Sequence, residues 1–324
     1  MSNEHRNRGV APSNAMQRRS LFSPFIVALL FGSPGLLGEA AAETSAQRPN
    51  LLWIISDDLG LELVAQLDEA GLAENTIVVF FGDHGRPHVR CKQWLYEGGL
   101  ATPLIVRWPA RLKAGQVRDD LVSLVDLPAT CLEWIGEEVP DWMQGRSFAD
   151  PDAAGRDYVF AARDRCGDAE DRIRSVRGDR LKYIRNFRPE LPYMQTSIYK
   201  EMAYPVVHVL RSLHARGELS DDAARFMAET RPAEELYDLH ADPHELHNLA
   251  DDPAHREDLE AMRRRLDDWM AATGDQGDQQ EDPAMVQSYR QQRQALYRRW
   301  LAARGLPENA DPDALIAWWT SHYE

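Results

Sequence analysis

Two pairs of side chains that can bind a metal ion follow short apolar runs of this sequence. Asp57 and Asp58 come directly after one run, and Asp83 and His84 come directly after a second. Carboxylate oxygens fixed in this way are the ligands that a hard divalent cation prefers. A solvated turn and an exposed histidine also explain each pair by itself, so the metal hypothesis depends on the two pairs lying together.

The residues around these pairs predict a strand, a helix and a second strand. Residues 51–55 are apolar without interruption, and Thr76 to Phe81 follows as a second predicted buried strand. Apolar residues recur at helical spacing over 63–70. A parallel unit of this kind places the ends of both strands at one edge of a sheet, where ligands bind. We therefore expect all four side chains to reach one divalent cation.

The rest of the chain predicts an α/β protein with further strands and a helical tail. The polar stretch at 150–156 is the predicted boundary between two parts. The predicted strands are 103–108, 158–161, 173–176 and 181–184, and the last two form a hairpin. We also predict a helix over 121–135, interrupted by Pro128, and an amphipathic helix over 259–270. Residues 274–282 are a predicted exposed loop.

Three more segments make the pattern specific. Lys92 stands four residues before Tyr96-Glu97-Gly98-Gly99, and Pro103 to Pro109 follows as Pro-Leu-Ile-Val-Arg-Trp-Pro. A closing segment runs from Glu235-Leu236-Tyr237-Asp238 to Asn248-Leu249. Together with the two acidic motifs, and in this order, these segments resemble the sulfatase family, on the side of the heparan N-sulfatases (N-sulfoglucosamine sulfohydrolases).

The resemblance implies a fold, a site and a substrate class. The fold would be a remnant of the alkaline-phosphatase-like sheet with helices on both faces, plus a C-terminal subdomain of antiparallel strands and helix. Asp57, Asp58, Asp83 and His84 match the calcium ligands of the family, where many members carry Asn in place of His84. Lys92 matches the lysine that contacts the sulfate, although without its flanking motif it would be an ordinary solvated lysine. The implied substrates are sulfated glycosaminoglycans or other sulfated carbohydrates.

The sequence departs from the family at the nucleophile. Sulfatases use a formylglycine made from the Cys or Ser of a Cys-x-Pro-x-Arg pattern, and no cysteine of this chain, at 91, 131 or 166, begins such a pattern. Ser212 has the arginine but not the proline, and it lies in the wrong region. The segment that carries the nucleophile in the family is missing at the junction Gly60–Leu61. We therefore expect the printed chain to be inactive as a sulfatase for lack of the nucleophile. The alternatives are a non-catalytic metal-binding fragment and a phosphoryl-transfer hydrolase of the same superfamily.

The cysteines predict no disulfide framework. Three cysteines can form at most one disulfide within the chain. Cys131 lies on an apolar helical face and is most simply a core residue. Cys91 stands between Arg90 and Lys92, which could lower its thiol pKa, although a structural role is the simpler interpretation.

The first residues predict export. A signal peptide is predicted over 1–42, because Arg18 and Arg19 precede an apolar run and the small residues Ala40-Ala41-Ala42. We expect a truncated sulfatase catalytic domain over 43–155 and a C-terminal sulfatase subdomain with a helical tail over 156–324. The expected location is periplasmic or secreted, with no stable membrane span after cleavage. The net charge of −15 argues against nucleic acid as a partner. The same charge repels anionic ligands at long range, so an anion site must rest on local basic residues and a metal. The oligomeric state stays open.

Overall fold

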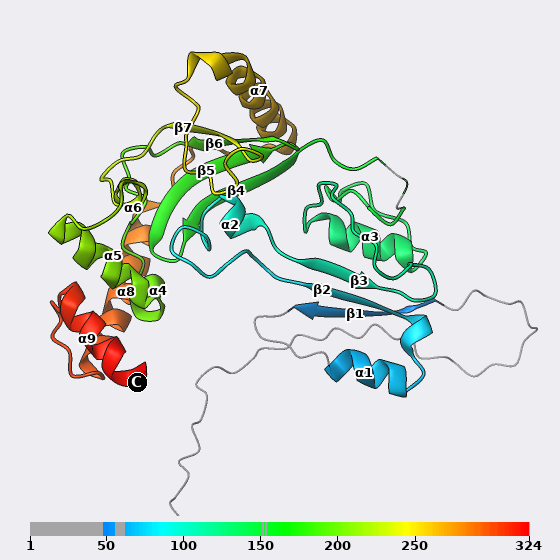
Figure 1. Cartoon of the computed structure of the whole chain (residues 1–324), viewed down its shortest axis with the longest axis horizontal. Helices are drawn as coiled ribbons and strands as arrows, with labels where there is room; N and C mark the ends of the chain where they lie inside the picture. Colours follow the sequence, from blue (N-terminus) through cyan, green and yellow to red (C-terminus); the bar gives the residue numbers. More distant parts are fainter. Residues whose placement is uncertain (1–47, 56–61, 151, 153, 324) are drawn as a thin grey trace, which may run out of the picture.

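The computed structural model describes residues 48–55, 62–150, 152 and 154–323. The predicted signal peptide and the pair Asp57 and Asp58 lie outside the described residues. The described chain is a mixed α/β structure with two separate sheets, as expected (Figure 1).

The first sheet contains the predicted strand, helix and strand. Its strands are β1 (Asn50–Ile55), β2 (Thr76–Phe81) and β3 (Leu104–Arg107), in the order β1-β2-β3. β1 and β2 are parallel, whereas β3 is antiparallel to β2. The connection from β1 to β2 contains α1 (Glu62–Glu69) and the short 3-10 helix η1 (Ala73–Asn75). The parallel crossover unit predicted from the apolar spacing is therefore present.

The two faces of this sheet pack against different helices, because successive side chains of a strand point to opposite faces. Leu52, Ile54 and Val78 share one face with Leu67 of α1. α3 (Asp126–Trp134) covers the other face, so helices lie on both sides of the sheet as expected (Figure 1). The buried cluster under α3 contains Ile77, Val79, Phe81, Trp108, Leu127, Cys131 and Trp134.

α3 begins later than the predicted helix over 121–135. Leu121 instead forms a β-bridge with Arg156, and the Asp126 carboxylate accepts a hydrogen bond from the Ser123 backbone N–H at 2.9 Å. Pro128 does not interrupt the helix, because it lies in the first turn, where a missing N–H costs no helical hydrogen bond.

The second sheet is antiparallel throughout. Its strands are β4 (Val159–Cys166), β5 (Ala169–Arg177), β6 (Leu181–Asn186) and β7 (Glu234–Asp238), in this order. The predicted hairpin between β5 and β6 is present, and both β4 and β5 are longer than predicted. The added residues include arginines that contact the loop before α8. Arg172 of β5 donates to the Gln279 carbonyl at 2.9 Å, and Arg165 of β4 lies 3.2 Å from the Glu281 carboxylate.

Helices cover the second sheet and extend beyond it. α7 (Arg256–Thr273), the predicted amphipathic helix, packs Leu259, Met262 and Leu266 onto one face of the sheet. The remaining helices are α2 (Glu97–Leu100), α4 (Ile198–Ala203), α5 (Pro205–Arg216), α6 (Asp221–Phe226), η2 (Pro253–His255), α8 (Pro283–Ala302) and α9 (Pro312–Tyr323). Among the described residues, we find no helix that is both long and apolar enough to cross a membrane.

Candidate functional site

The parallel pairing of β1 and β2 ends both strands at one edge of the first sheet. The last paired residues are Ile55 and Phe81, so the chain leaves both strands at the same end of the sheet. Asp83 and His84 follow β2 at this edge. Asp57 and Asp58 follow β1 but lie outside the described residues, so their approach to Asp83 stays a prediction.

His84 has an unpaired ring nitrogen next to a carboxylate. Its Nδ1 lies 2.7 Å from the carbonyl oxygen of Gly85, and because a carbonyl only accepts, Nδ1 carries the proton. In the neutral ring Nε2 then keeps its lone pair; this atom is buried, has no hydrogen-bond partner and lies 3.5 Å from Oδ1 of Asp83. A backbone carbonyl on one nitrogen and a free lone pair on the other is the usual arrangement of a metal-binding histidine.

Asp83 and His84 fit a divalent cation as a partial donor set. The part of the chain that the structure describes contains no group of three His, Cys, Asp or Glu side chains placed to hold a metal ion. Two donors do not complete a site, so a cation here needs further ligands, which we expect from Asp57 and Asp58. A nitrogen donor is unusual for calcium, because calcium takes oxygen ligands.

A large cleft adjoins these two residues. It has a volume of about 1590 Å³ and lies between the first sheet, the loop over 109–124 and the second sheet. Besides Asp83 and His84, its polar lining includes Glu97, Arg177 and His240. The cleft therefore offers charged groups of both signs beside the candidate metal ligands.

The loop that carries Asp83 is held by two glycines of the Tyr-Glu-Gly-Gly motif. The backbone N–H of Gly85 donates to the Gly99 carbonyl at 2.9 Å, and that of Arg86 donates to the Gly98 carbonyl at 2.8 Å. A Cβ on Gly99 would lie 2.1 Å from the Cys91 carbonyl oxygen, and a Cβ on Gly85 would lie 2.3 Å from that of Gly98. Only glycine permits this backbone approach, so the motif has a structural role.

Lys92 lies away from the cleft. Its backbone N–H donates to the Arg86 carbonyl at 3.1 Å, which folds the loop back, and its ammonium lies 5.4 Å from the centre of the Tyr199 ring in α4. Lys92 is not among the residues that line the cleft beside Asp83 and His84. The structure therefore brings Asp83 and His84 together and places Lys92 next to the C-terminal helices.

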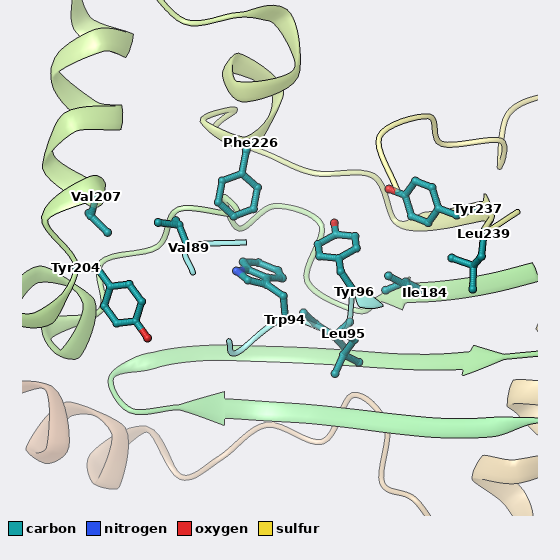
Figure 2. Packing of buried hydrophobic residues seen from close by; sticks show 11 residues of the cluster. Val89, Trp94, Leu95, Tyr96, Ile184, Tyr204, Val207, Phe226, Tyr237 and Leu239 are labelled. Carbon is teal, nitrogen blue, oxygen red and sulfur yellow. The ribbon is translucent and has the colours of Figure 1, made fainter. Parts of the chain in front are cut away.

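The loop after Asp83 packs into the C-terminal half of the chain. Figure 2 shows Trp94, Leu95 and Tyr96 pointing into a core that also contains Ile184 of β6 and Tyr237 of β7. The Tyr96 hydroxyl donates to Oε2 of Glu235 at 2.8 Å, and both groups are buried. The closing segment at 235–249 thus forms the binding surface for the loop.

Charged groups complete this contact. The backbone N–H of Glu97 donates to Oε2 of Glu245 at 2.7 Å. The fully buried Lys182 ammonium lies 2.9 Å from Oε1 of Glu97 and 3.3 Å from Oε1 of Glu245. Burial raises the pKa of Glu245, and the Lys182 charge opposes that rise. Sequence reasoning missed Lys182, whose only signal is a lysine within the apolar strand Leu181 to Ile184.

Cys91 and Cys131 lack the properties of a nucleophile. All three are free thiols. Burial raises the pKa of the Cys91 thiol, with Arg86 and Arg90 only opposing this effect, so the possibility of a lowered pKa is wrong. Cys131 is buried in the core as predicted, and burial raises its pKa to about 11.

Ser212 is also part of the packing rather than of a site. It is buried in α5, where its hydroxyl donates to Asp313 of α9 and accepts from Nη1 of Arg216 at 2.7 Å. The arginine that gave the partial match to the family pattern thus binds the serine within one helix. This arrangement agrees with the sequence, in which Ser212 lacks the proline of the family pattern and lies in the wrong region.

Comparisons with known proteins agree with these motifs. The sulfatase family model matches residues 49–137. An ulvan-active sulfatase of Formosa agariphila is 37% identical over 255 residues, which cover 78% of this chain and 41% of that protein. Human N-sulphoglucosamine sulphohydrolase is 31% identical over 239 residues, covering 67% of this chain and 46% of that protein.

A solved structure gives a partial overlap. A 2-O GAG sulfatase superposes with a TM-score of 0.49 and 23% identity, covering 69% of this chain and 43% of the other. The chain spans less than half the length of the two curated relatives above. From the matched family segment and the identity to these relatives, the chain belongs to the sulfatase family.

Proposed function

We propose that this chain binds sulfate esters of carbohydrates beside a divalent cation at the edge of the first sheet. The observation that carries the proposal is the donor pair at this edge: the free Nε2 of His84 lies 3.5 Å from the Asp83 carboxylate, and both residues line the 1590 Å³ cleft. The names of relatives that act on ulvan and on N-sulphoglucosamine support a sulfated carbohydrate as the ligand class.

Asp83 and His84 would hold the cation together with Asp57 and Asp58, with calcium expected from the family. A bound cation supplies positive charge that attracts the sulfate oxygens and stabilises negative charge on them. Lys92 is the proposed further sulfate contact, as the resemblance implies. Because its ammonium lies over Tyr199, it must leave this ring to reach a ligand at Asp83.

We further propose that the printed chain binds such esters without turning them over. Sulfate transfer needs a nucleophile that splits the displacement into two easier steps. The three cysteines are not within the required pattern, and the buried Ser212 is engaged by Arg216. Neither the cysteines nor Ser212 then supplies the nucleophile of the family, and we expect attack on the sulfur to fall to water.

Calorimetry and a turnover assay test this proposal. Titration with an aryl sulfate in excess calcium should show binding, and Asp83→Ala should abolish it. His214→Asn, at an exposed histidine of α5 that does not line the cleft, should leave the affinity within about threefold. Product should stay below one equivalent per chain. Multiple turnovers with aryl sulfate, lost in Asp83→Ala, would contradict the inactive state, and turnover of an aryl phosphate alone would favour a phosphoryl-transfer hydrolase.

A further inference from the structure

A small polar cavity lies inside the C-terminal half, apart from the cleft. It is lined by the loop at Gln93 and Trp94, by Arg163 of β4 and by Ser197, Lys200 and Glu201 at the start of α4; we refer to it as the Arg163 cavity. Its volume is about 10 Å³, which is roughly the space that one water molecule needs. The cavity therefore accepts a single small particle and excludes sulfate, phosphate and carboxylates.

Some buried polar atoms of this cavity have no hydrogen-bond partner within the protein. Arg163 is 9% exposed, yet its Nε and Nη1 make no hydrogen bond, and neither does the hydroxyl of Ser197, which is 2% exposed. The carboxylate of Asp171 is 3.6 Å from Nη1 of Arg163, beyond hydrogen-bond distance, and both its oxygens accept from Arg231. Because buried donors without an acceptor are costly, an occupant that accepts hydrogen bonds is expected.

The charges around the cavity do not balance. Lys200 is buried, and its ammonium donates to a neutral group, the Val89 carbonyl, at 2.9 Å. The Glu201 carboxylate is paired with Arg211, at 2.7 Å. Of the charged side chains that line the cavity, Arg163 and Lys200 are cations and Glu201 is a carboxylate that Arg211 neutralises. Arg163 shares the Asp171 carboxylate with Arg231, and the Asp168 carboxylate binds the backbone N–H of Ile198. A buried ammonium that contacts only a neutral carbonyl favours an anion over water, because a buried cation without a counter-charge is unfavourable.

We propose that the Arg163 cavity binds one monatomic anion, chloride under physiological conditions. The ion accepts hydrogen bonds from Arg163 and from the Ser197 hydroxyl and supplies the missing counter-charge for Lys200. The carboxylate of Glu201 does not repel it strongly, since Arg211 neutralises that carboxylate. This site is separate from the proposed sulfate site, and its failure would leave the proposed function untouched.

Bromide identifies the occupant directly. Crystals of the full chain soaked in sodium bromide should give an anomalous bromine peak between Arg163 and Ser197. Ordered water at this position, in a crystal whose surface shows other bromide sites, would overturn the proposal.

A solution measurement uses variants of the same cavity. The melting temperature should rise with chloride, relative to sodium gluconate at equal ionic strength, because an ion that binds only the folded state stabilises it. Ser197→Ala should require about tenfold more chloride for the same rise, while Ser321→Ala, at an exposed site, should match the parent chain. Arg163→Met should lose the chloride effect. An unchanged chloride dependence of the melting temperature in Ser197→Ala and Arg163→Met would refute the site. If Arg163→Met does not fold, Ser197→Ala and the bromide soak still test it.

Discussion

The Lys182 ammonium and the Glu97 carboxylate join the two sheets of this protein at 2.9 Å, and the lysine side chain is fully buried. Glu97 belongs to the Tyr-Glu-Gly-Gly motif beside the first sheet, and Lys182 belongs to β6 of the second. Their contact, with Glu245 as a third member, fixes the loop after Asp83 against the C-terminal half of the chain.

Replacing this lysine should strongly destabilise the fold. We expect Lys182→Met to lower the free energy of unfolding by about 3 to 5 kcal/mol, because it leaves the buried Glu245 carboxylate without its cation. Urea unfolding measures the change. Lys113→Met, at an exposed lysine, should alter it by less than about 0.5 kcal/mol. An equal effect of both substitutions would contradict the role assigned to Lys182.

A second prediction concerns the backbone approach at Gly99. Gly99→Ala should destabilise the protein by about 1 to 3 kcal/mol, since the new Cβ meets the Cys91 carbonyl oxygen of a fixed backbone. In Gly98→Ala the new Cβ meets the Cys91 thiol at 2.8 Å instead, so adding Cys91→Ala should relieve that variant. The same second substitution should not rescue Gly99→Ala. Thermal unfolding of the four variants compares the two positions.

The buried Lys200 should make stability depend on pH. Burial, with a smaller effect of the Arg163 charge, lowers its pKa from 10.5 to about 8. Between pH 8 and 10.5 the unfolded chain therefore still holds the Lys200 proton, whereas the folded chain has lost it. The free energy of unfolding rises with pH over this window, and this contribution is lost as pH falls through 8.

Comparison with Lys200→Met isolates this group from tyrosines that titrate in the same window. In sodium gluconate without chloride, the parent chain should gain stability relative to Lys200→Met as pH rises from 8 to 10. Urea midpoints at each pH provide the measurement. A difference between the two chains that stays constant with pH would show that Lys200 keeps its ordinary pKa.

The nitrogen donor of His84 should affect the choice of metal. We expect His84→Asn to weaken Zn²⁺ binding by about tenfold or more, because imidazole suits zinc, and to leave Ca²⁺ binding unchanged or stronger, because the amide offers an oxygen. Calorimetric titration with each ion measures both affinities, and His240→Asn serves as the matched control. Equal losses for both ions would mean that His84 supports the loop and does not bind the cation.

The sequence alone determined the parallel unit of the first sheet and the family. Unbroken apolar runs predicted β1 and β2 because both strands are covered by helices on each face. The order of the motifs identified a sulfatase, since each motif combines residue types that chance does not place together. The buried position of Cys131 followed from apolar helical spacing in the same way.

Only the tertiary structure decided what the motifs contact. The Tyr-Glu-Gly-Gly and closing segments are separated by more than a hundred residues, and no local pattern shows that Tyr96 donates to Glu235 or that Lys182 joins Glu97 to Glu245. The free nitrogen of His84 and the unpaired donors of Arg163 are likewise properties of their surroundings. Sequence spacing reports which face of an element is apolar, whereas the partners of buried charges depend on how distant elements pack.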